Sequence, residues 1–354
     1  MLPGAATALL ALAALAALAT LAACGATAPH RARPATALRP IGAGLRGPAG
    51  LEASVYATGV PTVATLTFDS RGRLWAAAAG LSTHTHDGVY LIARAGPRAQ
   101  AQARPQPRRV ISGLDDPLGL LWRGDTLYVA SVGRVDAYSD LRGTHFRRHR
   151  EIVKGPVAGG ENNDLVAGPG GRLLLGITAT CDRCTPTSPY SGAIVSFRPD
   201  GSGLRVYAAR IRAPVGLAYY PGTSRLFVSM NQPNDLGAHT PGDWLAVVRP
   251  GENFKFPACY GQGGPACAGV PKPVAVLDPH AAVGAVAFMT PEAALVAQWQ
   301  VPKVQKVSLA STGAGSVSPF LTGLEHPLAL VLARDHSLLV GDWGSGRIYR
   351  VAAG

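Results

Sequence analysis

One phrase, repeated six times, limits what this chain can fold into. Each copy holds an apolar segment, a turn rich in glycine, aspartate or proline, and a second apolar segment that contains a leucine at an equivalent place. The six equivalent leucines are Leu74, Leu127, Leu173, Leu226, Leu295 and Leu338. They recur at intervals of 43 to 69 residues, the spacing of propeller blades. A third strand follows each copy, and a fourth generally follows that. The repeat predicts an all-β protein, a six-bladed β-propeller.

The way in which the ring closes follows from the ends of the repeat. The sixth copy reaches only three strands before Gly354, whereas Ala53–Ala57 precedes the first copy without a blade of its own. We therefore expect this N-terminal strand to close the last blade and cover its open edge. The 43 glycines and 29 prolines disfavour long helices. A two-sheet sandwich does not explain six copies.

The N-terminal region predicts export. Residues 1–23 carry no charge and are almost pure alanine and leucine from Leu9 onward, which is typical of a signal peptide. Leu21–Gly25 resembles a lipobox, in which Cys24 becomes the lipidated N-terminus; an ordinary signal peptide beside a stray cysteine is the alternative. Residues 24–50 are rich in alanine, proline and glycine, so we expect a flexible tether before the propeller of residues 51–354. The predicted location is the outer side of the cytoplasmic membrane, with contact through the lipid anchor only.

Four cysteines remain once Cys24 is set aside: Cys181, Cys184, Cys259 and Cys267. An even number outside the reducing cytosol favours two disulfides, 181–184 and 259–267. A zinc site competes with this interpretation, but the seven residues between the second pair suit it poorly.

Propeller geometry places two sets of loops at one end of the central channel, which we call the mouth. These are the connections from the fourth strand to the next blade and the loops between the second and third strands. Their polar residues include His84, His86, Asp87, Asp115, Asp116, Asn162, Asn163, Asp164, Arg212, Asn231, Glu325, His326 and Asp342. Convergent polar groups at a concave mouth predict a binding site there.

Several of these groups suit particular chemistry. Glu161 and the residues up to Asp164 either cap a turn or bind a hard cation, and the oxygen-rich loop with Asn234 and Asp235 fits Ca²⁺ or forms a plain turn. His280 is a candidate general base or an ordinary loop histidine. Trp299 and Trp343 suit a stacking platform for a sugar or cofactor, with packing between blades as the alternative use.

The net charge of +12, from 33 Lys+Arg against 21 Asp+Glu, raises the question of nucleic acid. The basic stretches Arg104–Arg109 and Arg142–Lys154 lack aromatic residues at a stacking spacing, and the chain carries an export signal. A solvated outer-strand surface is the better interpretation, and we expect no nucleic-acid partner.

The order of several phrases resembles the exported quinoprotein sugar dehydrogenases, the group of soluble glucose dehydrogenase and sorbosone dehydrogenase that is sometimes labelled NHL-type. The resemblance spans about Ala57–Ala352. The phrases that carry it are Asp164–Gly176, Thr180–Cys184, Ser196–Tyr207, Arg212–Ala218, Gly251–Pro257 and Gly341–Arg350.

The resemblance implies pyrroloquinoline quinone (PQQ) at the mouth, Ca²⁺ beside it, and removal of hydride from a sugar or polyol with a histidine as base. Arg212 matches the family's quinone-contacting arginine, and Lys303 lies near a basic position of blade five. Trp299 joins them as a cofactor contact.

Two positions depart from the family pattern. Gly160 stands where the catalytic histidine is expected, and Ala213 replaces the asparagine after the arginine. Glu161 or His280 is then the candidate base. The alternatives are a catalytically degenerate binding propeller anchored by lipid, or a Ca²⁺-dependent hydrolase of the lactonase type. Because Thr185 follows Cys184, no Cys-x-x-Cys-His haem motif is present, and electrons would leave to a separate acceptor.

Overall fold

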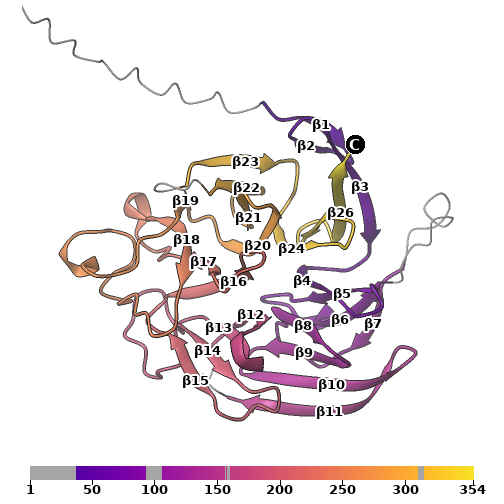
Figure 1. Ribbon diagram of the computed structural model, residues 1–354, viewed down its shortest axis with the longest axis horizontal. Helices are drawn as coiled ribbons and strands as arrows, with labels where there is room; N and C mark the ends of the chain where they lie inside the picture. The colour runs from indigo at the N-terminus through magenta and orange to yellow at the C-terminus, as the bar shows by residue number, and fades with distance from the viewer. Residues whose placement is uncertain (1–36, 93–105, 156, 158–159, 310–314) are drawn as a thin grey trace, which may run out of the picture. The chain divides into compact units, whose positions relative to one another are not determined.

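Six four-stranded antiparallel sheets form a ring in this computed structural model, which describes residues 37–92, 106–155, 157, 160–309 and 315–354 (Figure 1). In each sheet the strands pair in chain order from the channel outward. The strands of blades one to three are β4 (Val63–Phe68), β5 (Leu74–Ala78), β6 (Gly88–Ile92) and β7 (Arg108–Ile111); β8 (Gly119–Arg123), β9 (Thr126–Ser131), β10 (Arg134–Arg142) and β11 (His145–Lys154); and β12 (Asn162–Ala167), β13 (Leu173–Ile177), β14 (Ala193–Phe197) and β15 (Arg205–Ala208). The six predicted blades are confirmed.

The other three blades continue the same order, except for the outermost strand of the last. Their strands are β16 (Ala213–Tyr219), β17 (Leu226–Asn231), β18 (Gly242–Val248) and β19 (Ala275–Pro279); β20 (Val283–Thr290), β21 (Ala293–Gln298), β22 (Lys303–Ser308) and β23 (Val317–Leu321); and β24 (Pro327–Leu332), β25 (Leu338–Asp342), β26 (Arg347–Ala353) and β3 (Leu51–Thr58). Strand β3 pairs with β26 over its whole length, from Arg347 opposite Thr58 to Ala353 opposite Leu51. The expected closure of blade six by the N-terminal strand is therefore confirmed.

The apolar core is divided among the junctions between blades. Six clusters of buried side chains lie in the described part of the chain, and each draws on two neighbouring sheets. Second strands such as β5 and β13 are buried on both faces, which explains why they read as continuous apolar runs instead of alternating. Each blade is thus stable only between its neighbours.

Glycines mark the places where neighbouring blades come closest. A Cβ added at Gly119, Gly176, Gly216 or Gly284 would lie 2.3–2.4 Å from a backbone carbonyl oxygen of the next blade, closer than any real contact. At Gly341 it would lie 2.5 Å from the Val63 side chain in blade one. A larger residue at any of these positions would force the neighbouring blade to shift, because its backbone, or at Gly341 the Val63 side chain, already fills the space.

Residues 39–47 correct one prediction. Strands β1 (Arg39–Gly42) and β2 (Leu45–Gly47) form a separate two-stranded sheet, and Ile41 and Leu45 are buried against blades five and six. Arg46 and Thr322 exchange two backbone hydrogen bonds of 3.0 Å. The predicted flexible tether up to residue 50 is therefore wrong for this stretch, because its two apolar side chains find a core. Residues 1–23, Cys24 and the start of the tether lie outside the described residues.

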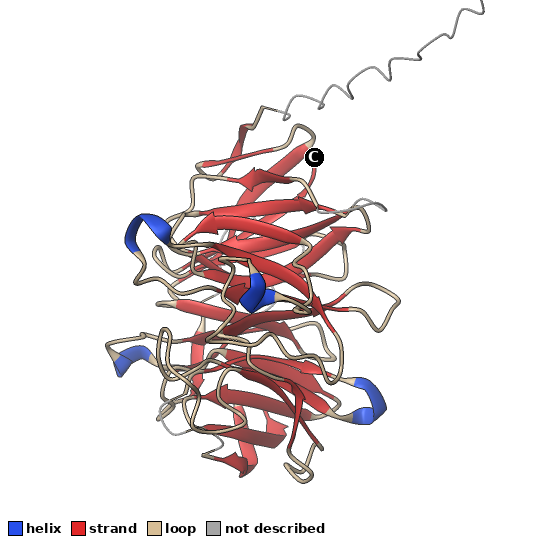
Figure 2. Cartoon of the chain, turned by 90° about the vertical axis from the view of Figure 1, so that its left-hand side faces the viewer, coloured by secondary structure: helices blue, strands red, loops and turns tan. Residues whose placement is uncertain are grey.

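Both predicted disulfides are present. Cys181 and Cys184 lie with their Cα atoms 5.7 Å apart, and those of Cys259 and Cys267 are 4.9 Å apart. Each bridge closes a short loop outside the strands. Among the described residues, the loops also contain the 3₁₀ turns η1 (His84–His86), η3 (Pro169–Gly171), η4 (Gly237–His239) and η5 (Pro265–Cys267) (Figure 2). None of the helical turns in the described residues has the length and apolar character needed to cross a membrane.

The contact at Gly216 yields a stability prediction. Its added Cβ would also lie 2.8 Å from the Ala285 Cα and 2.9 Å from the Ser229 Oγ, so Gly216→Ala must push blades four and five apart. We expect the free energy of unfolding in urea to fall by about 1–3 kcal/mol. Val276→Ala, at an exposed position in the same blade, should change it by less than about 0.5 kcal/mol. Equal effects of the two variants would contradict the prediction.

Candidate functional site

The loops assigned to the mouth do meet there. His84, between the second and third strands of blade one, lies 3.3 Å from Asp115 in the connection to blade two. The Arg212 guanidinium, in the connection to blade four, pairs with Asp182 in the corresponding loop of blade three. The contacts therefore bring the two sets of loops together.

The channel below the mouth is nearly filled. First strands from all six blades line a cavity of about 30 Å³, the share of one water molecule, and Asn163 and Asp164 lie in its wall. Asp164 Oδ1 and Oδ2 accept backbone N–H groups of Leu165 (2.9 Å) and Leu217 (3.0 Å). Burial raises the pKa of Asp164 to about 6, although these hydrogen bonds act in the opposite direction. A ligand larger than a water molecule therefore does not fit in this part of the channel.

Two predicted pocket asparagines join blades instead. Asn162 Nδ2 donates to the backbone oxygens of Ser131 (2.7 Å) and Arg134 (3.1 Å) in blade two. Asn163 Nδ2 donates to Thr178 Oγ1 (2.7 Å) and to the Pro214 oxygen in blade four (3.2 Å). Both side chains are buried, so they position the mouth without facing it.

At the mouth over blades three and four, Glu161 and Arg212 are electrostatic neighbours. The Glu161 side chain is accessible, yet protein surrounds its carboxyl closely enough that desolvation raises its pKa. The Asp116 charge raises this pKa further, whereas a hydrogen bond to Thr178 and the Arg212 charge lower it. Arg212 itself is mostly buried and is held by Asp182 through its Nη2 and through a 3.3 Å bond from Nε to the Asp182 carbonyl.

The loop predicted to bind a metal is held by protein groups. Asp182 accepts the backbone N–H groups of Asn234 and Asp235 at 3.0–3.2 Å, and the Asp235 carboxylate pairs with Arg183 at 2.8 Å. Asn231 Oδ1 accepts the backbone N–H of Val283 at 2.7 Å. Asn234 and Asp235 are therefore placed by Asp182, a residue whose role the sequence did not reveal.

A different cluster gathers possible metal ligands, over blades one and two. Ligand atoms of His84, Asp87 and Asp115 all lie within 4.8 Å of one another. The hydrogen bond that His84 Nδ1 donates to Asp87 Oδ2 (2.9 Å) raises the pKa of His84, and the charges of Asp116 and Asp115 add to this. Asp87 is buried and also accepts the backbone N–H groups of Gly80 (2.7 Å) and Asp116 (2.8 Å). Both Asp87 oxygens already accept hydrogen bonds. We therefore interpret the cluster as an imidazole positioned by a carboxylate. The sequence analysis placed all of these residues at the mouth but did not predict that they contact one another.

Across the mouth, Lys303 Nζ pairs with Asp278 Oδ2 at 2.8 Å, and the lysine side chain is 16% exposed. His280, two residues after Asp278, is exposed and has a left-handed backbone (φ 52°). In the described part of the chain no hydrogen bond or ion pair links His280 to Glu161 or Arg212. The structure thus brings Glu161 to the predicted cofactor arginine, but it does not bring His280 there.

The predicted aromatic platform is a cluster between blades five, six and one. The Trp299 ring stacks on His326 with centroids 4.4 Å apart and meets Trp343 edge-on at 5.3 Å. Trp343 Nε1 donates to the Ala79 oxygen in blade one, so this tryptophan serves packing between blades. Buried Asp342 accepts the backbone N–H groups of Glu325 (3.0 Å) and His326 (2.7 Å), which positions this cluster.

No family model matches the sequence, and no curated protein matches it either. Solved structures match over most of the fold. The calcium structure of the AA12 enzyme from Trichoderma reesei has a TM-score of 0.69 and 18% identity, over 87% of this chain and 96% of that one. The holo PQQ domain of pyranose dehydrogenase from Coprinopsis cinerea has a TM-score of 0.71 and 16% identity, over 87% and 96%. The PQQ-bound aldose sugar dehydrogenase from Streptomyces coelicolor has a TM-score of 0.66 and 19% identity, over 86% of this chain and 99% of that one. These neighbours belong to the group that the sequence resembles, and the chain shares their propeller fold.

The buried carboxyl of Asp164 yields a pH prediction. Its pKa lies above the ordinary value, so between about pH 4 and pH 6 the native state holds a proton that the unfolded state has released. The free energy of unfolding should therefore fall as pH rises across this window, by about 1–3 kcal/mol from this one group.

Asp164→Asn should remove that part of the pH dependence, as measured by urea unfolding at pH 4.5 and 7.5. Asp125→Asn, which removes an exposed carboxylate, is the control and should leave it in place. An unchanged pH dependence in Asp164→Asn would count against a buried, proton-retaining carboxyl.

Proposed function

We propose that this protein is a quinoprotein-like oxidoreductase that oxidises a hydroxyl group of a sugar or polyol at the propeller mouth. The observation that carries the proposal is the placement of Glu161 beside Arg212. Their backbone oxygens accept hydrogen bonds from the adjacent residues Thr178 and Ala179, which brings a candidate base near the residue that matches the quinone-contacting arginine. The propeller fold shared with PQQ-bound sugar dehydrogenases supports it.

The cations of the mouth suit the carboxylates of PQQ. Arg212 and Lys303 have side chains 14% and 16% exposed, and each is held by one carboxylate, Asp182 and Asp278. A guanidinium fixed in this way presents its remaining N–H groups without an entropy cost on binding. Trp299 keeps a buried Nε1 without a partner and is the candidate contact for the ring system. PQQ, when bound, supplies the acceptor for the hydride.

The residues predicted for Ca²⁺ fit less well. This ion takes six to eight oxygen ligands, but Asp235 is engaged with Arg183, and Asp182 is surrounded by N–H donors. We retain Ca²⁺ in the proposal because a calcium structure exists for the Trichoderma reesei enzyme, which shares this fold. We assign it no ligands and no step.

Glu161 is the proposed base. A Cβ at Gly160, where the family histidine is expected, would lie 2.9 Å from a methyl carbon of Val157, so a histidine does not fit there without rearrangement. Glu161 in its ionised form accepts the hydroxyl proton, and Arg212 beside it keeps the carboxylate from being protonated too readily.

The replaced histidine also favours a second candidate, a binding propeller that has lost catalysis. Both candidates share a mouth that takes a sugar or polyol. Export, a lipid anchor on Cys24 at the outer side of the cytoplasmic membrane, and a separate electron acceptor remain part of the proposal.

Binding of PQQ tests the cofactor. We expect residues 36–354 to bind PQQ saturably. Binding is measured by the absorbance of the quinone, once in the presence of Ca²⁺ and once in the presence of EGTA. Arg212→Ala should weaken binding at least tenfold, because it removes a charge-assisted partner worth about 1.5–3 kcal/mol. Arg350→Ala breaks a similar pair with Asp335 away from the mouth and is the matched control. Absence of binding at micromolar PQQ would overturn the quinoprotein proposal.

Reduction of bound PQQ tests the base. Bleaching on addition of aldoses and polyols should become faster as pH rises through a pKa above the ordinary value of 4.5, because only ionised Glu161 accepts a proton. Glu161→Gln should bind PQQ as the wild type does but bleach it about 10²–10⁴-fold more slowly. PQQ binding without any bleaching in the wild-type protein would instead support the degenerate binding propeller.

A further inference from the structure

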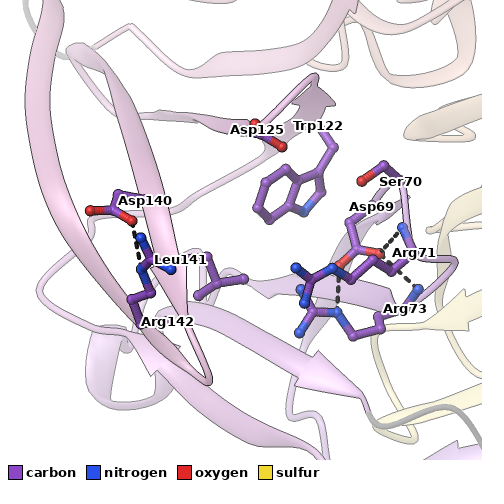
Figure 3. Close-up of a pocket in the computed structure, with 9 residues that line it drawn as sticks. All are labelled: Asp69, Ser70, Arg71, Arg73, Trp122, Asp125, Asp140, Leu141 and Arg142. Carbon is purple, nitrogen blue, oxygen red and sulfur yellow. Dashed lines mark hydrogen bonds and ion pairs between the residues drawn. The ribbon is translucent and has the colours of Figure 1, made fainter.

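A second pocket lies at the end of the propeller opposite the mouth, between blades one and two (Figure 3). Its volume is about 240 Å³, roughly eight water molecules. It is lined by the turn Asp69–Arg73 of blade one and, in blade two, by Trp122, Asp125 and the segment Asp140–Arg142. These segments belong to the turns that point away from the mouth.

The pocket exists because one outer hairpin is unusually long. Strands β10 and β11 have nine and ten residues, whereas the third and fourth strands of the other blades have four to eight. The extra length carries Asp140, Leu141 and Arg142 past the inner strands and makes a wall. The hollow is therefore a feature of blade two and not a gap that every junction of blades repeats.

The charged groups of the pocket balance one another. Asp69 pairs with Arg73 at 2.6 Å, and Asp140 pairs with Arg142 at 2.9 Å. Asp69 is buried and also accepts the backbone N–H groups of Arg71 and Arg73 and the Nε1–H of Trp75, which makes this wall rigid. Two charged side chains in the lining, Arg71 and Asp125, have no side-chain partner in the described part of the chain, and both are exposed. One cation and one anion are thus available to a ligand.

Trp122 supplies an apolar surface beside these groups. Its ring is half-buried and is supported from behind by Trp75 at 5.3 Å and Phe146 at 5.9 Å between centroids. A rigidly supported indole offers a flat face for the C–H groups of a sugar ring. The Ser70 hydroxyl also lines the pocket.

We propose that this pocket binds one pyranose ring of a neutral saccharide. The sugar stacks on Trp122, the Arg71 guanidinium donates to its hydroxyl oxygens, and the Asp125 carboxylate accepts from its hydroxyl groups. An anion such as phosphate is disfavoured, because three arginines are matched by three aspartates and Asp125 would repel it. The volume admits one ring, so neighbouring units of an oligosaccharide would extend along the surface.

This inference does not depend on the mouth. The site touches none of the residues of the proposed oxidation site, and it would hold a glycan at the far end of the ring. A protein with both sites could stay attached to a saccharide while its mouth remains accessible.

Isothermal titration of the purified protein with neutral methyl pyranosides and trisaccharides of glucose, galactose and mannose tests the inference. We expect at least one neutral trisaccharide to bind, with an affinity that is the same at low and high salt. Arg71→Ala and Asp125→Ala remove exposed side chains and should each weaken binding at least tenfold. Trp122→Phe, which keeps an aromatic ring in the packing, should weaken it less.

Two controls separate the sites. Arg148→Ala, an exposed arginine of β11 outside the pocket, and Arg212→Ala at the mouth should both bind the saccharide as the wild type does. The inference is overturned if no saccharide of the panel binds or if Arg71→Ala and Asp125→Ala bind normally. It also fails if only Arg212→Ala loses binding, or if glucuronate and inorganic phosphate bind in its place with strong salt dependence. None of these outcomes bears on PQQ binding, which tests the proposed cofactor separately.

Discussion

Close contact between neighbouring inner strands is the constraint on which this molecule depends. At Gly119 and Gly216 the next blade's carbonyl oxygen occupies the place of a Cβ, so the sheets meet at the channel with no side chain between them. This contact leaves a cavity of only about one water molecule in the channel. It also sets the radius of the ring and, with it, the distances between the loops of successive blades. The mouth is a consequence of how tightly the ring closes.

Carboxylates and amides at the mouth also hold neighbouring blades together, through hydrogen bonds. Asp182 accepts backbone N–H groups from a loop of blade four, and Asp87 and Asp342 accept them from the connections between blades one and two and between blades five and six. Buried carboxylates with several such bonds are effective clamps, because each N–H would otherwise lose its hydrogen bond to water. The same oxygens suit a hard cation, and for this reason the residue type alone does not separate a ligand from a clamp.

The two ends of the propeller differ in what they leave available. At the mouth, Arg212 and Lys303 are each held by one carboxylate, and Glu161 stays accessible with a raised pKa, an arrangement suited to an anionic cofactor and a proton transfer. At the opposite end, the long hairpin of β10 and β11 builds a pocket with balanced charge around Trp122. The two sites differ in how their charged groups are held: the mouth presents Arg212 and Lys303, each fixed by one carboxylate, whereas the opposite pocket leaves one exposed cation and one exposed anion for neutral polar groups. Each lies where loops, and not the repeating strands, carry the variation.

The sequence by itself determined the blades, their number and the strand that closes the ring, because apolar strands and turns recur in the same order at intervals of about one blade. It also indicated the two disulfides and the loops that form the mouth. Only the tertiary structure decided which side chains pair. Asp235 meets Arg183, Asp115 meets His84, and Ile41 and Leu45 find a core in blades five and six instead of remaining in a tether. Those partners lie in other blades or loops, and a pairing across blades depends on distances that no local pattern records.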